Sequence, residues 1–144
     1  MTTGMPQGRR EVRELTDAER EAFMADNRFA AVAFVGEKPY VITLVYRYVK
    51  GTVVLPIRTT GRKWSYINKN PNVCLHVWQW GEQCNVPSLK EQRFSSVVLD
   101  GKLEEIPEAD RSYYELPPPS KGVDRVAFKL KVDTVGTKCM KWSA

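Results

Sequence analysis

The sequence predicts a mainly β protein, a small closed antiparallel barrel with a few short helices. Three observations support this fold class. Six segments are rich in Val, Ile, Thr, Tyr and Phe, the residues that are enriched in strands. Most of these segments are joined by short turns, which connect antiparallel rather than parallel neighbours. Closure into a barrel also removes the exposed edges that an open six-stranded sheet would present.

The chain is expected to begin with an arm and a helix. Residues 1–14 are polar and contain three arginines, which predicts a flexible arm before a single domain over residues 15–144. Thr16 and Glu19 have the spacing of a capping box, in which each side chain caps the other residue's amide. A short helix is therefore expected to begin there and to end near Asp26.

The strands and the remaining helices follow from local patterns. Six strands are expected, at residues 28–35, 40–48, 52–57, 73–80, 93–105 and 125–135, the first three as a meander. Asp100-Gly101 predicts a bulge or kink inside the fifth strand. Two further helices are expected, at residues 61–70 with Thr60 as N-cap and at residues 107–116 before the stiff Pro117–Pro119 connector.

Length and composition limit the class of protein. The chain has 144 residues, 42% hydrophobic and 27% charged, which predicts one folded domain. The longest apolar run, residues 29–35, is too short to cross a bilayer, and the first residues lack a secretory signal, so a cytoplasmic location is expected. Three cysteines without a Cys-x-x-Cys pair, and one histidine, predict reduced thiols and no metal site.

The basic residues are concentrated in one part of the chain. Residues 38–81 contain no Asp or Glu and carry seven of the 22 basic residues. The rest of the chain has 15 basic and 17 acidic residues, a net charge of −2, so the whole excess of +5 lies in this block. A block of this kind indicates an anion-binding site, although a chance gap between acidic residues would give the same pattern.

The start of the helix at residues 61–70 is the candidate site within that block. Arg58 and Thr59–Lys63 stand where a strand ends and a helix begins. The first helical amides lack partners and lie at the positive end of the helix dipole, which suits a phosphate. Gly61 allows the backbone to approach a ligand closely. The spacing of the glycine and the basic residues differs from that of a P-loop. The alternative is an ordinary solvated helix start that carries basic side chains.

These residues and the motifs around them resemble the pyridoxamine 5′-phosphate oxidase-related proteins, which are FMN-binding split barrels of Greek-key type. Thr59–Lys63 followed by Asn70–Val73 is similar to the strand-helix-strand core of the family. Residues 39–43 resemble its Gly-x-Pro-x-Val strand, and residues 94–102 resemble its Ser-Val-x-x-x-Gly strand. The resemblance covers residues 15–142 and is greatest for the 5-nitroimidazole-reductase-like branch.

The resemblance implies a cofactor, an assembly and a set of binding residues. FMN is expected between the subunits of a homodimer, with its phosphate held by Arg58, Thr59, Thr60, Gly61, Arg62 and Lys63. The ring is expected beside Thr43, Leu44, Val45, Pro56 and Ile57, with Ser96 contributed by the other subunit. The implied function is a flavin-dependent oxidoreductase that acts on an unidentified small molecule.

Two departures from the family pattern bear on that function. Several members of the branch have a histidine where this chain has Pro56, which puts a reaction that uses this histidine in doubt and removes one backbone amide. The C-terminal Lys138–Trp142 has no counterpart to the substrate-phosphate residues of the full oxidase. Oxidation of vitamin B6 is therefore not expected, and no catalytic residue is assigned.

Several alternatives stay open from the residues alone. The barrel could be a non-catalytic module for flavin, haem or a deazaflavin coenzyme, or a binder of single-stranded nucleic acid, because basic and aromatic residues occur together. Charge clustered at residues 58–63 favours flavin over nucleic acid. Trp78 and Trp80 are expected on the same face of one strand, where they could be core or dimer contacts or could stack on a flavin. His76 fits a strand position that is either packed or faces solvent. Neither paired carboxylates nor a Ser-His-Asp set supports a hydrolase.

Overall fold

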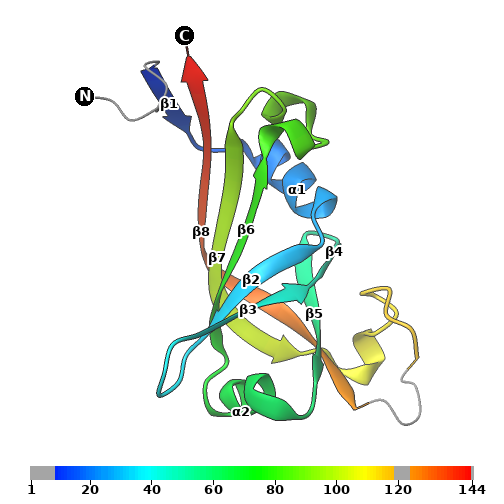
Figure 1. The fold of residues 1–144 in the computed structure, drawn as a ribbon. Helices are drawn as coiled ribbons and strands as arrows, with labels where there is room; N and C mark the ends of the chain where they lie inside the picture. Colours follow the sequence, from blue (N-terminus) through cyan, green and yellow to red (C-terminus); the bar gives the residue numbers. More distant parts are fainter. Residues whose placement is uncertain (1–8, 119–123, 144) are drawn as a thin grey trace.

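The computed structural model describes residues 9–118 and 124–143. Two α-helices, α1 (Asp17–Asp26) and α2 (Gly61–Lys69), accompany the strands (Figure 1). The strands are β1 (Arg9–Arg13), β2 (Phe29–Phe34), β3 (Tyr40–Val45), β4 (Arg47–Val49), β5 (Thr52–Arg58), β6 (Asn72–Trp80), β7 (Phe94–Glu105) and β8 (Arg125–Ser143). Short 3₁₀ turns lie at Gly81–Gln83, Pro87–Leu89 and Glu108–Asp110. Neither α-helix in the described ranges is long and apolar enough to span a bilayer.

The strands form one curled antiparallel sheet, which confirms the predicted mainly β fold. Its order is β3-β2-β6-β7-β8-β5-β4, with β1 paired to the end of β8 (Figure 1). β8 has a central place, since it pairs with β5 through Arg125–Lys129, with β7 through Phe128–Met140 and with β1 through Cys139–Ser143. The predicted irregularity at Asp100-Gly101 is confirmed as a register shift opposite β8. The sheet is a split half-barrel of eight strand segments rather than six strands in a closed ring.

The segment predicted as one strand over residues 40–48 is divided at Tyr46. This side chain is only 1% exposed, its hydroxyl donates to the Met24 carbonyl at 2.7 Å, and its amide donates to the Arg28 carbonyl at 2.8 Å. Tyr46 therefore turns the chain from β3 at one end of the sheet order to β4 at the other. The hairpins β2-β3 and β4-β5 are antiparallel as predicted, but β3 does not pair with β5, so the meander is not continuous.

The N-terminal segment corrects the predicted flexible arm. Arg9–Arg13 is strand β1, paired in register with residues 139–143, while residues 1–8 lie outside the described ranges. The arm is held because Arg13 forms an ion pair with Glu19 at 2.7 Å. Glu19 also completes the predicted capping box with Thr16, so the same carboxylate starts α1 and anchors β1.

Two further segments differ from their predicted form. Residues 107–116 hold one 3₁₀ turn rather than an α-helix, because a short isolated segment gains little from helical hydrogen bonds and Glu115 takes a left-handed φ of 57°. Arg111 donates to the Pro117 carbonyl and fixes the following turn, while Pro119 of the predicted connector lies outside the described residues. β8 continues to Ser143, eight residues beyond its predicted end at Val135.

Candidate functional site

The connection from β5 to α2 has the geometry of an anion site. β5 ends at Arg58, the Thr59 amide donates to the Asp124 carbonyl at 3.0 Å, and α2 begins at Gly61. Gly61 has a left-handed φ of 88°, and a Cβ at this position would have no neighbour within 4 Å, so glycine is needed for conformation rather than for space. Thr60 is the N-cap as predicted, but its side chain makes no capping hydrogen bond. The first amides of α2 therefore have no side-chain cap.

The cations at this connection lack acidic partners. None of the ion pairs among the described residues involves Arg58, Arg62 or Lys63. Arg58 is exposed and lies directly opposite Arg125 of β8, which adds a cation that the sequence analysis did not assign to the site. Lys63 is half-buried in the first turn of α2. Positive charge therefore gathers where the helix dipole also favours an anion.

Arg62 has a different environment from Lys63. Its guanidinium carbon lies 4.1 Å from the ring centre of Tyr40 and 5.4 Å from that of Tyr66. Nη2 of Arg62 donates to the Tyr66 hydroxyl at 3.4 Å, and that hydroxyl donates to the Lys38 carbonyl at 3.2 Å. Arg62 thus links α2 to the start of β3 through cation-π contacts. Because its guanidinium already makes these contacts, Arg62 is less available to a phosphate than the sequence predicted.

The predicted ring-contacting residues lie on two strand edges. β3, which contains Thr43, Leu44 and Val45, pairs only with β2 and is therefore an end strand of the sheet. β4 pairs with β5 only as far as Val54, so one edge of β5 beyond that residue has no strand neighbour. Pro56 is exposed on that segment, whereas the Ile57 side chain is in the core, so Ile57 can meet a ligand only through its backbone.

Ser96 is not brought to this site within one chain. It pairs with Lys138 on β8, thirteen residues beyond Arg125, the partner of Arg58. That separation corresponds to about 40 Å of extended strand. Ser96 instead lines a cavity of about 360 Å³ on the outer sheet face, together with His76, Trp78, Trp80, Phe94 and Lys138. The structure confirms that Trp78 and Trp80 share a face, where their rings meet edge to face at 5.3 Å.

The outer face of the sheet is unusually apolar for a surface. Phe29, Val41 and Val45 are 62%, 65% and 52% exposed; Phe29 stands opposite Val45, and Val41 stands opposite Ala33 farther along the same face of β2 and β3. The sequence did not predict this surface, because the alternation of apolar and polar residues identifies the two faces of a strand but not which face the fold covers. Exposed apolar patches of this kind mark sites of association.

All three cysteines are free thiols, and Cys84 is buried although it lies in a loop. Burial raises the pKa of the Cys84 thiol above its ordinary value, which disfavours the nucleophilic thiolate. Within residues 9–118 and 124–143, no group of three His, Cys, Asp or Glu side chains has the arrangement of a metal site.

Comparison with solved structures identifies proteins that share this fold. The chain can be superimposed on an FAD-binding protein from Mesorhizobium loti (24% identity, 89% of this chain, 97% of the other, TM-score 0.67). It also matches a protein provisionally described as a 5-nitroimidazole antibiotic resistance protein, from Bacteroides thetaiotaomicron (16% identity, 91% and 88%, TM-score 0.69). A third match is an F420 reductase (17% identity, 81% and 94%, TM-score 0.56). At these identities the matches show a shared fold.

The family is shown by a sequence profile. No curated protein sequence matches the chain. The profile of the pyridoxamine 5′-phosphate oxidase family matches residues 16–128, which include both strand edges, the β5-α2 connection and Ser96. The chain therefore belongs to the pyridoxamine 5′-phosphate oxidase family.

Proposed function

We propose that this protein binds FMN, with the phosphate at the start of α2. The observation that carries the proposal is the uncapped first turn of α2 beside Arg58 and Lys63, two cations that form no ion pair within residues 9–118 and 124–143. Free amides and a bidentate arginine together match the oxygens of a phosphate. The family and the FAD-binding neighbour support a flavin as the molecule that carries this phosphate.

The phosphate contacts are proposed to be unequal. Lys63 and Arg58 are free to meet the anion, whereas Arg62 is already stacked on Tyr40 and hydrogen-bonded to Tyr66. Arg62 would then act mainly by holding α2 against β3. The ring of the flavin would extend from the phosphate along the open edges of β3 and β5, where backbone groups have no strand partner.

A homodimer is proposed to complete the site. Ser96 and Trp78 lie on the outer sheet face, far along β8 from the start of α2, so only a second copy can bring them to the flavin. The exposed apolar side chains of β2 and β3 on the same face supply surface for such an association. The two subunits would then enclose two equivalent flavins.

Oxidoreductase activity is the proposed role of the bound flavin. The flavin would supply electron transfer, and the chain would position the ring and exclude water from it. The description of the family as an oxidase supports this class of reaction. Pro56 offers neither a titratable side chain nor an amide to the ring. If FMN-loaded protein is mixed with NADPH without oxygen, loss of the visible flavin absorption would support the proposal, and an unchanged spectrum with NADH and NADPH would favour a binding module.

Flavin binding is tested by comparing FMN with riboflavin, which lacks the phosphate. Lys63→Ala removes one charge-assisted contact and should weaken FMN about ten- to a hundredfold, while riboflavin affinity changes little. Quenching of flavin fluorescence during titration measures both affinities. Lys69→Ala is the matched control, because Lys69 lies in the last turn of the same helix, where the dipole disfavours an anion.

The control variant should bind FMN within about threefold of the unmodified protein. Equal loss of FMN and riboflavin in Lys63→Ala would mean that Lys63 supports the fold rather than the phosphate. Equal effects of Lys63→Ala and Lys69→Ala would indicate a diffuse basic surface, as expected for nucleic acid. The absorption spectrum of protein purified without added cofactor separates FMN from haem and from a deazaflavin.

A further inference from the structure

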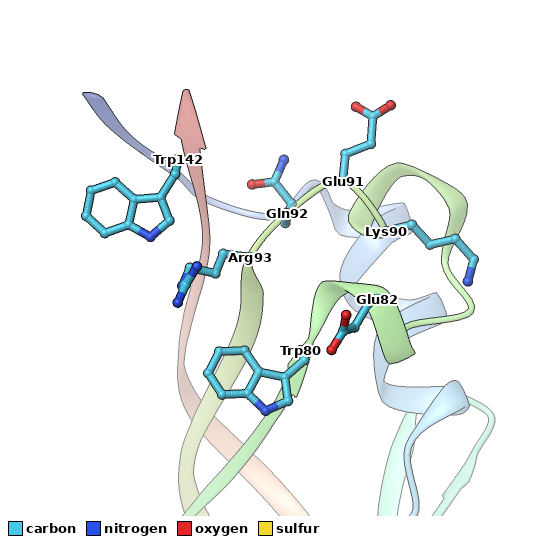
Figure 2. A pocket seen from close by; sticks show the side chains of 7 residues that line it. All are labelled: Trp80, Glu82, Lys90, Glu91, Gln92, Arg93 and Trp142. Carbon is cyan, nitrogen blue, oxygen red and sulfur yellow. The ribbon is translucent and has the colours of Figure 1, made fainter. Parts of the chain in front are cut away.

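A second pocket lies where β6 ends, β7 begins and β8 ends. It encloses about 500 Å³, and its walls include Trp80, Arg93 and Trp142. Figure 2 shows the side chains of these three residues projecting to the same side of the strands. The pocket is near β1 and the C-terminal end of β8, at the opposite end of the molecule from α2 (Figure 1). It is therefore separate from the proposed phosphate site of the same chain.

The wall of this pocket is held rigidly by the loop between β6 and β7. The Gly81 amide donates to the Arg93 carbonyl at 2.9 Å, and the Arg93 amide donates to the Met140 carbonyl at 2.6 Å. A Cβ at Gly81 would lie 1.6 Å from the Gln92 carbonyl oxygen, so the two backbones touch directly. Leu89 anchors the same loop in the core. The pocket is thus formed before any ligand arrives.

Two indoles give the pocket its aromatic character. Trp80 is 42% exposed at the end of β6, and Trp142 is half-buried near the end of β8. Within the described residues, Nε1 of Trp142 is buried and has no hydrogen-bond acceptor. A buried donor without an acceptor is unfavourable, so an acceptor supplied by a ligand would be stabilised there. Flat indole faces also attract planar rings.

Arg93 supplies a charge that the protein leaves without an acidic partner. None of the ion pairs or cation-π contacts among the described residues includes it. Glu91 is paired with Lys141 at 3.9 Å, and in Figure 2 Lys90 points away from the two indoles. Arg10 of β1 stands opposite Trp142 and adds positive charge at this end.

Glu82 restricts the charge that a ligand can carry at the other end of the pocket. It lines the same pocket, and Figure 2 places its carboxylate beside Trp80. A second acidic group on a ligand would be repelled there, whereas a ring N–H would be accepted. The pocket is therefore suited to a flat ring with its anionic group at one end only.

We propose that this pocket binds a planar aromatic molecule with one anionic group, its ring against an indole face of Trp80 or Trp142 and its anion on Arg93, which lies between the two indoles in Figure 2. Such a ligand has two chemical sources, an aryl carboxylate or a nucleoside monophosphate, and an arginine fork donates hydrogen bonds to either anion. The proposal goes beyond flavin binding and does not require the flavin.

The test is calorimetric titration of the full-length protein, without FMN and with saturating FMN, with 2-naphthoate and with 5′-AMP. We expect at least one of them to bind, and uncharged 2-naphthalenemethanol or adenosine to bind at least about tenfold more weakly. Binding of 2-naphthoate alone would identify the aryl-acid source, and binding of 5′-AMP alone the nucleotide source. Either result supports the pocket, provided that FMN is not displaced.

Variants locate the binding. Arg93→Gln should weaken the charged probe about tenfold or more, whereas Lys102→Gln, an exposed cation farther along β7 and outside the pocket lining, should change affinity less than about threefold. FMN affinity should be unchanged in both, which separates this proposal from flavin binding. The proposal is overturned if neither probe binds at millimolar concentration, or if Arg93→Gln and Lys102→Gln behave alike. It is also overturned if Trp142→Leu weakens the dimer while no probe binds, which would mean that a second copy fills the pocket.

Discussion

Replacing Glu19 by Gln should destabilise the protein at neutral pH and much less in acid. The Glu19 carboxylate is 8% exposed and receives hydrogen bonds from Arg13 at 2.7 and 3.0 Å, from the Thr16 amide at 2.9 Å and from the Ser88 hydroxyl at 2.7 Å. These contacts, above all the one with Arg13, lower the pKa of Glu19 from its ordinary value of 4.5 to about 2.

The size of the effect follows from that pKa. Lowering the pKa of Glu19 from 4.5 to about 2 corresponds to about 3 kcal/mol of extra stability for the ionised form. The Arg13 side chain is 45% exposed, so solvent screens part of the interaction, and a loss of about 1.5–3 kcal/mol is expected for Glu19→Gln at pH 7. Because the folded-state pKa is lowered, the stabilisation is complete above the ordinary pKa and disappears as the pH falls from about 4.5 to 2.

Urea unfolding at pH 7 and at pH 2.5 measures this difference. The free energy of unfolding should differ between the variant and the unmodified protein by about 1.5–3 kcal/mol at pH 7 and by much less at pH 2.5. Asp17→Asn is the control, since its pair with Arg20 at 3.2 Å is exposed and should contribute less than about 0.5 kcal/mol. An equal loss at both pH values would refute the reasoning, because it would show that shape rather than charge gives Glu19 its role.

Three other outcomes are expected. Phe29→Glu on the exposed apolar face should convert the proposed dimer into a chain of 16.5 kDa, and a light-scattering mass that is unchanged by the substitution would exclude this face as the interface. Gly81→Ala should cost about 1–3 kcal/mol by urea unfolding, whereas Gly136→Ala, with its nearest neighbour at 4.0 Å, should change stability by less than about 0.5 kcal/mol. Burial raises the pKa of Cys84 and Cys139, so both thiols should react slowly with a disulfide reagent in the folded protein, and rapid modification of both in native buffer would contradict their burial.

The features that the sequence predicted correctly are those set by neighbours in the chain. The Thr16–Glu19 capping box needs only a spacing of three residues, and the break at Asp100-Gly101 needs only a glycine in a strand. The start of α2 at Gly61 follows from the same kind of local pattern. Local hydrogen bonds and backbone freedom decide these features before tertiary structure forms.

The features that could not be predicted depend on distant residues. Tyr46 divides its strand because its hydroxyl reaches Met24 in α1, a contact that strand propensity does not encode. From the sequence, Arg62 and Lys63 are equivalent as phosphate ligands, but in the structure Tyr40 of β3 lies under the Arg62 guanidinium. The pocket of Trp80, Arg93 and Trp142 joins three strand ends, and its last member lies beyond the predicted end of the final strand.

The central position of β8 has a consequence for synthesis on the ribosome. While residues 1–124 emerge, β2 can pair with β3 and β6, β6 with β7, and β4 with β5, because all these partners are already present. The β4-β5 hairpin cannot join the rest of the sheet, since only β8 lies between β5 and β7. The nascent chain therefore carries two unjoined pieces of sheet with an open β7 edge, a template for aggregation, until β8 has emerged and paired.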